Sequence, residues 1–289
     1  MEQNVRTLLA HVRARLDQAG AEVIPMPDLE ARELTACALG VDRRLLPALG
    51  AQSVSQEAWQ QAEALTDRRL GGEPLAYVLG EWDFYGITLR VTPDVLIPRS
   101  DTERLCELAI ERVHGQTAPQ VLDLCSGSGC IALALLHEVR TAQAIAVDLS
   151  PDAVAVANDN AARLGLQDRY QCVIGSALEP PPAAYCDRFD LMVCNPPYIT
   201  AEEMGELDHD VADFEPHLAL YGGPDGLDFY RTIMKTWRYA VKPGGQLLFE
   251  CGWKQGEDVA AICRQAGLTD VQVETDYAGV PRIVCAVRG

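Results

Sequence analysis

The sequence predicts an α/β protein in which a small helical bundle precedes a doubly wound sheet. Two patterns carry this prediction. Apolar residues recur at helical spacing over residues 1–72, and short apolar runs alternate with glycine turns and helical segments from residue 119 onward. A chain of 289 residues is also long enough to bury a large apolar core.

The first part of the chain, residues 1–72, is expected to form the helical bundle. Helical spacing of apolar residues covers three segments, and each ends on glycine, which is typical of a helix C-terminus. The segments are 4–20, 29–39 and 55–70, and Ser55 is expected to cap the third.

A connector, residues 73–99, follows the bundle. Aromatic and β-branched residues with glycines between them predict a hairpin over 75–91. Pro98 ends the extended segment, and Ser100 or Asp101 is expected to cap the next helix.

Residues 100–289 are expected to form the second domain, which contains the sheet. Strands are expected at 121–124, 144–147, 170–174, 191–194, 246–250, 271–274 and 283–287. Helices are expected at 131–139, 151–164, 228–241 and 257–266. The alternation predicts a sheet that is covered by helices on both faces.

Composition restricts the class of function. Acidic residues outnumber basic ones 42 to 24, and the formal charge of -18 disfavours unaided binding to nucleic acid. No secretory signal and no apolar run of membrane-spanning length are present, so the ten cysteines are expected to be reduced thiols of a cytoplasmic protein. No cysteine pair has CxxC spacing and the histidines do not cluster, so no metal site is expected.

The first chemical motif is a loop of small residues after the strand at 121–124. Gly127, Gly129 and Ala132 fit the pattern GxGxxA, and Asp148 ends the next strand, where a carboxylate can accept both hydroxyls of a ribose. Asp123 is expected to order the loop by accepting bonds from backbone N–H groups. The motif indicates a cofactor that contains adenosine, without saying which.

The second motif follows the strand at 191–194 and reads Asn195, Pro196, Pro197, Tyr198. The asparagine oxygen and a neighbouring backbone carbonyl can accept both protons of a planar NH2 group, while the aromatic ring packs on its face. The two prolines hold this geometry. The motif therefore predicts a substrate NH2 that is conjugated to a carbonyl or a ring.

With both motifs in view, the sequence resembles the HemK/PrmC family of peptide chain release factor glutamine methyltransferases. The resemblance covers nearly the whole chain and includes further matching segments at 73–81, 91–99, 214–216 and 222–230. It implies a Rossmann-like, seven-stranded class I methyltransferase sheet, joined by a β-hairpin connector to an N-terminal substrate-binding domain.

The resemblance also implies the chemistry. The cofactor is S-adenosyl-L-methionine, and the methyl group goes to the side-chain nitrogen of the glutamine in the Gly-Gly-Gln motif of release factors. The implied cofactor-binding residues are Cys125, Ser126, Gly127, Ser128, Gly129, Asp148, Leu149, Ser176, Ala177 and Asn195. The implied substrate-binding residues are Phe84, Asn195, Pro196, Pro197 and Tyr198, of which Asn195, Pro196 and Tyr198 are the catalytic ones. We expect a monomer whose partner is the release factor, without direct contact to nucleic acid or membrane.

Several alternatives stay open. A glutamine methyltransferase of a ribosomal protein fits the same motifs, and so does an adenine-N6 methyltransferase of nucleic acid, although the charge disfavours the latter. A nicotinamide-dependent oxidoreductase or a non-catalytic binding module would leave Asn195 to Tyr198 unexplained. Arg99 either positions a ligand or is simply exposed, and Glu103 either pairs with Arg99 across one helical turn or contacts the cofactor. Cys125 and Ser126 stand where the family usually has glycine and threonine.

Overall fold

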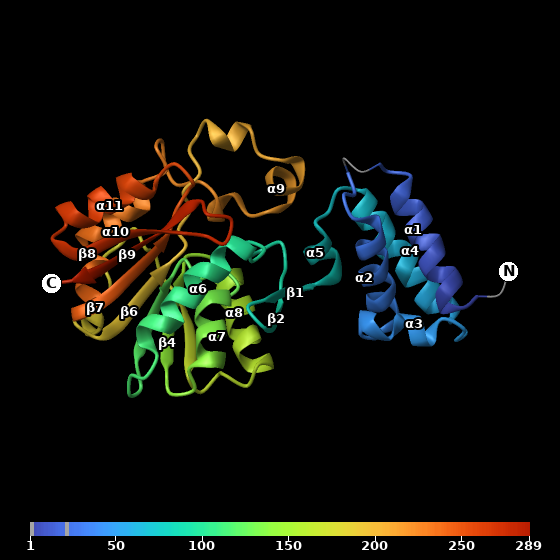
Figure 1. Cartoon of the computed structure of the whole chain (residues 1–289), viewed down its shortest axis with the longest axis horizontal. Helices are drawn as coiled ribbons and strands as arrows, with labels where there is room; N and C mark the ends of the chain where they lie inside the picture. The colour runs from blue at the N-terminus through green and yellow to red at the C-terminus, as the bar shows by residue number, and fades with distance from the viewer. Residues whose placement is uncertain (1–2, 21–22) are drawn as a thin grey trace. The chain divides into compact units, whose positions relative to one another are not determined.

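The structure is a computed structural model that describes residues 3–20 and 23–289 (Figure 1). The chain divides into two compact units. One comprises Met1–Glu81 with His209–Phe214, and the other comprises Trp82–Asp208 with Glu215–Gly289. Across the described residues, no helix is long and apolar enough to cross a membrane.

The first unit is helical, as predicted. Its helices are α1 (Val5–Asp17), α2 (Pro27–Leu39), η1 (Arg43–Leu45), α3 (Leu46–Leu49), α4 (Gln56–Leu70), α5 (Leu75–Leu79) and α9 (His209–Phe214). The apolar stripes of α1 and α2 meet in a core that includes Leu8, Leu16 and Leu34, all fully buried. The Ser55 hydroxyl accepts a bond from the backbone N–H of Ala58 and caps α4, as expected.

The connector differs in part from the prediction. Its first turn is the helix α5, which ends at Gly80, a glycine in the left-handed region with φ 77°. Strand pairing is therefore limited to β1 (Glu81–Phe84) and β2 (Ile87–Arg90). The aromatic and β-branched composition of the segment did not reveal this helix, because its five residues are too few to show a helical period.

The second unit is built on a seven-stranded sheet, as predicted. Its strands are β3 (Gln120–Leu124), β4 (Gln143–Asp148), β5 (Tyr170–Ile174), β6 (Phe189–Cys194), β7 (Val241–Glu250), β8 (Leu268–Thr275) and β9 (Pro281–Arg288). Their order is β5-β4-β3-β6-β7-β9-β8, and β9 runs antiparallel to both neighbours. This order, with one strand antiparallel to its neighbours, is a doubly wound seven-stranded sheet of the kind that the family resemblance implies.

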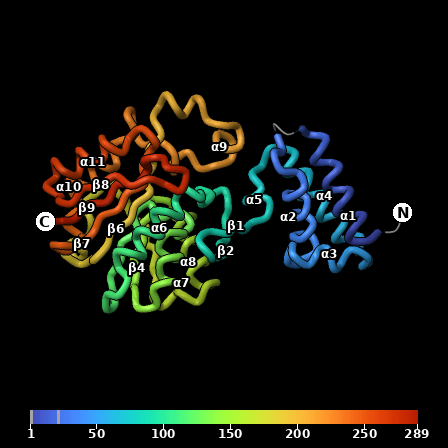
Figure 2. Tube along the Cα trace, viewed as in Figure 1, coloured from blue at the N-terminus to red at the C-terminus, as the bar shows by residue number. Residues whose placement is uncertain are grey.

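Helices cover both faces of this sheet (Figures 1 and 2). One apolar core contains residues of α6 (Ser100–Val113), α7 (Cys130–Glu138) and α8 (Pro151–Arg163). The other contains residues of α10 (Asp228–Lys235) and α11 (Gly256–Gln265). Short 3-10 helices complete the unit: η2 (Ala183–Tyr185), η3 (Glu203–Gly205), η4 (His217–Ala219) and η5 (Trp237–Ala240).

Two predictions of helix ends are wrong. The N-cap of α6 is Arg99, and neither Ser100 nor Asp101 forms a side-chain capping bond within the described chain; Asp101 instead pairs with Arg282 at 3.3 Å. The helix predicted over 228–241 is interrupted after α10. There the Trp237 indole N–H donates to the carbonyl of Glu179 at 2.7 Å, a tertiary contact that local spacing does not reveal.

The sheet order brings the two chemical motifs together. The chain leaves β3 toward β4 and β5 on one side, whereas β6 returns to the other side of β3. Leu124 and Cys194, the last residues of β3 and β6, are register partners. Because ligands of open α/β sheets bind at such a switch point, the loops that follow these two strands are placed to share one site.

Candidate active site

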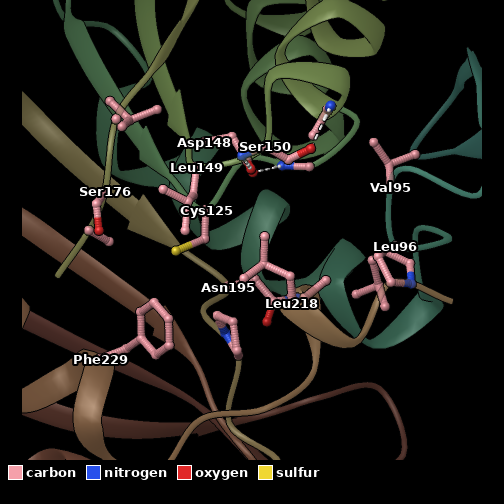
Figure 3. A pocket seen from close by; sticks show the side chains of 18 of the residues that line it. Val95, Leu96, Cys125, Asp148, Leu149, Ser150, Ser176, Asn195, Leu218 and Phe229 are labelled. Carbon is pink, nitrogen blue, oxygen red and sulfur yellow. Dashed lines mark hydrogen bonds between the residues drawn. The ribbon is translucent and has the colours of Figure 1, made fainter. Parts of the chain in front are cut away.

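A cavity of about 130 Å³ lies at the carboxyl ends of β3, β4, β5 and β6 (Figure 3). Residues that the sequence predicted at the site form much of its wall: Cys125, Gly127, Asp148, Leu149, Ser176, Ala177, Asn195 and Pro197. Figure 3 shows the labelled side chains of these separate segments gathered around one space. The sheet thus brings together residues that are up to 72 positions apart in the chain, from Cys125 to Pro197.

Asp148 connects two of the loops that surround the cavity. Its Oδ2 accepts a bond from the backbone N–H of Gly127 at 2.8 Å, and its Oδ1 accepts one from Ser150 at 3.0 Å. Burial raises the pKa of Asp148, and the two N–H donors oppose that shift. Each oxygen keeps a lone pair, so the carboxylate can still accept a hydroxyl of a ligand.

Asp123 does not play the part expected of it. Neither carboxyl oxygen of Asp123 has a hydrogen-bond partner among the described residues, and it is Asp148 that accepts a bond from the glycine loop. Complete burial raises the pKa of Asp123 to about 8. The prediction that Asp123 orders the loop is wrong because its carboxyl group is buried and accepts no hydrogen bond from the loop.

The glycine loop requires left-handed backbone at three positions. Two are Gly127 and Gly129, with φ of 53° and 81°. The third is Cys125, with φ of 59°, where a side chain costs about 1–2 kcal/mol. A Cβ at Gly129 would lie 2.6 Å from the hydroxyl of Tyr170, so this glycine is needed for close packing as well.

Three predicted cofactor residues, Ser126, Ser128 and Gly129, are not among the described residues that line the cavity. Ser126 and Ser128 are buried behind it. The Ser126 hydroxyl lies 3.3 Å from the sulfur of Cys172, and the Ser128 carbonyl accepts a bond from Asn160. In this structure the two serines attach the loop to β5 and α8.

The backbone of the second motif is clamped by its neighbours. The N–H of Ile199 donates to Leu220, the N–H of Gly222 donates to Ile199, and the Gln255 side chain donates to the carbonyl of Tyr198, at 2.9, 2.9 and 3.0 Å. Pro196 and Pro197 are buried. The end of the motif is therefore held by residues that lie 21 to 57 positions later in the chain.

The Asn195 side chain is oriented by a hydrogen bond to Thr102. Its Nδ2 donates to the Thr102 hydroxyl oxygen at 3.3 Å, which leaves its oxygen for other partners. The Tyr198 hydroxyl lies 3.5 Å from Oε1 of Glu250, a buried carboxyl that the sequence analysis did not select. Burial and the Glu250 charge raise the pKa of Tyr198, so its hydroxyl keeps its proton.

A second cavity, of about 510 Å³, brings Phe84 and Tyr198 together. Its other lining residues are Trp82, Asp83, Ile97, Pro98, Arg99, Ser100, Asp101, Glu103 and Arg282. Arg99 pairs with the buried Glu215, and Glu103 accepts the backbone N–H of Tyr85 at 2.9 Å. The suggested pair of Arg99 with Glu103 is thus wrong, because each finds a partner far away in sequence.

Sequence reasoning missed about half of the wall of the first cavity. The missed residues are Asp94, Val95, Leu96, Val147, Ser150, Ala153, Gly175, Leu178, Pro216, Leu218, Ala219 and Phe229. A partial signal existed, since Asp94, Val95, Leu96, Pro216 and Phe229 lie in segments that carried the family resemblance without an assigned role. The remaining residues, among them Val147 in β4 and Ala153 in α8, have no local signature of a ligand site.

Large apolar side chains are exposed around this cavity. Leu149 is 50% exposed, Leu178 45% and Leu218 55%, and all three line it. Exposed apolar side chains that gather at a cavity mark a surface that a ligand covers. Together with Asp148, they fit a ligand with a flat apolar part and neighbouring hydroxyl groups.

Two family models match the chain: residues 7–80 match the PrmC N-terminal domain, and residues 102–211 match the methyltransferase small domain. The release factor glutamine methyltransferase of Bradyrhizobium diazoefficiens is 38% identical over 291 residues, which cover 99% of this chain and 94% of that relative. The release factor glutamine methyltransferase of Bordetella pertussis is 44% identical over 261 residues, which cover 89% of this chain and 94% of that relative. A solved release factor-specific protein-(glutamine-N5) methyltransferase of Alicyclobacillus acidocaldarius is 28% identical with a TM-score of 0.42, covering 69% of this chain and 99% of that one.

Proposed function

The chain belongs to the family of release factor glutamine methyltransferases, and we propose that it methylates the side-chain amide nitrogen of the glutamine in the Gly-Gly-Gln motif of peptide chain release factors. The methyl donor is S-adenosyl-L-methionine. The relatives that support this activity match over 94% of their own lengths, so the comparison includes both the helical unit and the sheet.

The first cavity fits this cofactor. Asp148 offers carboxylate oxygens to the ribose hydroxyls, and the exposed side chains of Leu149 and Leu218 offer apolar surface to the adenine. The backbone of the loop at Cys125 and Gly127 borders the same space and would hold the methionine end. When bound, S-adenosylmethionine supplies a methyl group on a positively charged sulfur.

The orientation of Asn195 is the observation that carries the proposal. Asn195 lines the cofactor cavity, and its Nδ2 is engaged by Thr102. The free oxygen can therefore accept one proton of a substrate amide, and the carbonyl of Pro196 can accept the other. Tyr198 and Phe84 line the second cavity and would border the glutamine side chain there.

These contacts address the main chemical difficulty. A carboxamide nitrogen is a poor nucleophile because its lone pair is delocalised into the carbonyl group. Two acceptors fix the direction of the nitrogen and stabilise the positive charge that develops on it. Alignment alone can contribute up to about 7–11 kcal/mol when it is ideal. The proton leaves after transfer, so the proposal assigns no general base.

The charge of the chain supports a protein substrate. With a formal charge of -18, direct binding to nucleic acid would be opposed at most of the surface. We assign substrate recognition to the N-terminal helices and methyl transfer to the sheet unit, acting as a monomer in the cytoplasm, where release factors work.

A methyl-transfer assay with labelled S-adenosylmethionine tests the proposal. The substrates are full-length release factor, the same protein with its motif glutamine changed to alanine, a ribosomal protein preparation and a duplex oligonucleotide. Wild-type enzyme and Asn195→Ala are compared, and thermal unfolding verifies that the variant is folded.

The expected result is label on intact release factor only, lost with either substitution. Label on the oligonucleotide would instead indicate an adenine-N6 methyltransferase, and label on a ribosomal protein alone would indicate the related glutamine methyltransferase. Equal labelling of the release factor with and without its motif glutamine would refute the proposed acceptor.

A further inference from the structure

The Asn195 side chain poses a problem of direction that the proposed function leaves open. The two ends of a carboxamide have almost the same shape, yet only the oxygen can accept a proton from a substrate NH2 group. If the side chain turned by half a rotation, its own NH2 would face the substrate NH2, and two donors would oppose each other. Something near Asn195 must therefore fix which end faces outward.

Two buried polar residues lie on the inner side of Asn195. Thr102, in α6, accepts the bond from Asn195 Nδ2 at 3.3 Å. Glu250 is the last residue of β7, the strand next to β6. Cys194 of β6 and Phe249 of β7 are register partners, so Asn195 and Glu250, the next residue in each strand direction, lie side by side at the end of the sheet. Thr102 and Glu250 are each only 2% exposed.

Glu250 is in contact with both members of this pair. The Thr102 hydroxyl and the Asn195 amide face its carboxyl group and stabilise the charged form. Its Oε1 lies 3.5 Å from the Tyr198 hydroxyl, and its Oε2 has no hydrogen-bond partner within residues 3–20 and 23–289. A buried carboxylate with an oxygen that accepts no hydrogen bond lowers the stability of the folded state, so its presence here indicates a role other than stability.

We propose that Glu250, directly and through Thr102, is a positioning residue that keeps the Asn195 oxygen directed toward the substrate. The inference rests on the proposed function of Asn195. An ionised carboxylate only accepts hydrogen bonds, so the hydroxyl proton of Thr102 is directed to Glu250. The Thr102 oxygen is then left as an acceptor, and only the NH2 end of Asn195 satisfies it.

The charged surroundings make this arrangement sensitive to pH. The positive charge of Arg282 in β9 favours the ionised form of Glu250, whereas the negative charge of Asp101 in α6 opposes it. The Arg282 guanidinium also pairs with two other carboxylates, Asp101 at 3.3 Å and Asp276 at 3.2 Å. The other titratable groups nearby are Tyr198, Cys251, Cys130 of α7, and Tyr230 of α10, whose hydroxyl donates to the Glu250 backbone carbonyl.

Burial outweighs the favourable contacts and raises the pKa of Glu250 from 4.5 to about 7. Below that pH the carboxyl carries a proton and can donate to the Thr102 oxygen. The hydroxyl of Thr102 is then free to donate to the Asn195 oxygen, and the orientation of the amide reverses. Methyl transfer is therefore expected to fall as the pH is lowered through about 7.

Four variants separate this role from a merely structural one. Glu250→Gln removes the titration at nearly constant volume, Thr102→Val removes the hydroxyl, and Thr102→Ser restores it. Glu257→Gln is the matched control, because Glu257 lies in the first turn of α11 with its side chain 79% exposed. Neither Thr102 nor Glu250 is among the described residues that line the cofactor cavity, so S-adenosylhomocysteine affinity should be unchanged.

The expected kinetic result is a fall in kcat of about 100-fold for Thr102→Val, the size of effect that misplacing a reacting group produces, with recovery in Thr102→Ser. Glu250→Gln should lose the decline of kcat below pH 7, whereas Glu257→Gln should keep it. Wild-type kcat in both Glu250→Gln and Thr102→Val, with the acid decline retained, would overturn the proposal.

A second readout does not depend on turnover. In 15N-labelled wild-type enzyme, the side-chain NH2 resonances of Asn195 should shift with a midpoint near pH 7, and they should not do so in Glu250→Gln. A shift that persists in Glu250→Gln would overturn the proposal. If the release factor is not methylated at all, the proposed function fails, and this spectrum still decides whether Glu250 governs Asn195.

Discussion

Gly222 provides a direct test of how tightly the second motif must be held. Its φ is not in the left-handed region, so alanine brings no backbone strain of its own. The added Cβ would lie 2.5 Å from the carbonyl oxygen of Pro197 and 2.5 Å from the Cα of Tyr198. Both obstacles are backbone atoms, so no side-chain rotation can relieve the clash.

The size of the effect follows from these distances. Ordinary contact begins at 3.4 Å, so Gly222→Ala must displace the Pro197 and Tyr198 backbone by about 3.4 minus 2.5, or 0.9 Å. A misplacement of about 1 Å can cost on the order of 100-fold in rate, or about 2.7 kcal/mol. We expect kcat/KM for the release factor to fall by about that factor in Gly222→Ala.

The matched control is Gly205→Ala, since a Cβ at Gly205 would meet no described atom within 4 Å and its φ is also outside the left-handed region. Both variants are measured in the labelled methyl-transfer assay, and thermal unfolding verifies that both are folded. Activity of a folded Gly222→Ala within about threefold of Gly205→Ala would refute the idea that the motif needs a fixed backbone.

Three further predictions concern the cofactor site and its support. Asp148→Asn places an NH2 group against the backbone N–H of Gly127 or Ser150, so two donors face each other. Calorimetry should therefore find S-adenosylhomocysteine bound about 10- to 100-fold more weakly. A change in affinity below threefold would contradict the role of this carboxylate. S-adenosylhomocysteine should protect Cys125, which lines the cavity, from alkylation while the exposed Cys186 still reacts, as peptide mass mapping would show; equal labelling of Cys125 with and without ligand would argue against this cavity as the cofactor site. Because burial raises the pKa of Asp123 from 3.8 to about 8, the folded state keeps a proton that the unfolded state releases, and stability falls with rising pH across that window by about 1.4 kcal/mol per unit. Denaturant titrations at pH 5 and 8 should find a shallower dependence in Asp123→Asn, and an unchanged one would mean that the ionised carboxyl is accommodated.

The strands of the sheet unit illustrate what local pattern can predict. The run predicted at 170–174 is β5, Tyr170–Ile174, and the last residue of β6 is Cys194, as expected. Buried parallel strands are short apolar runs between turn residues, so their composition shows directly in the sequence. Helices such as α5 were missed because five residues are too few to show a period.

The sequence by itself determined the α/β class, the glycine loop and the residue types of the second motif, because each depends on backbone preferences within a few positions. Only the tertiary structure decided which distant groups meet them. Thr102 reaches Asn195 across 93 positions, and Arg99 pairs with Glu215 across 116 in place of Glu103 four residues away. The physical reason is that a buried polar group takes whichever partner the packed elements bring within bonding distance, and that is set by the order of the strands and by the helices packed on them.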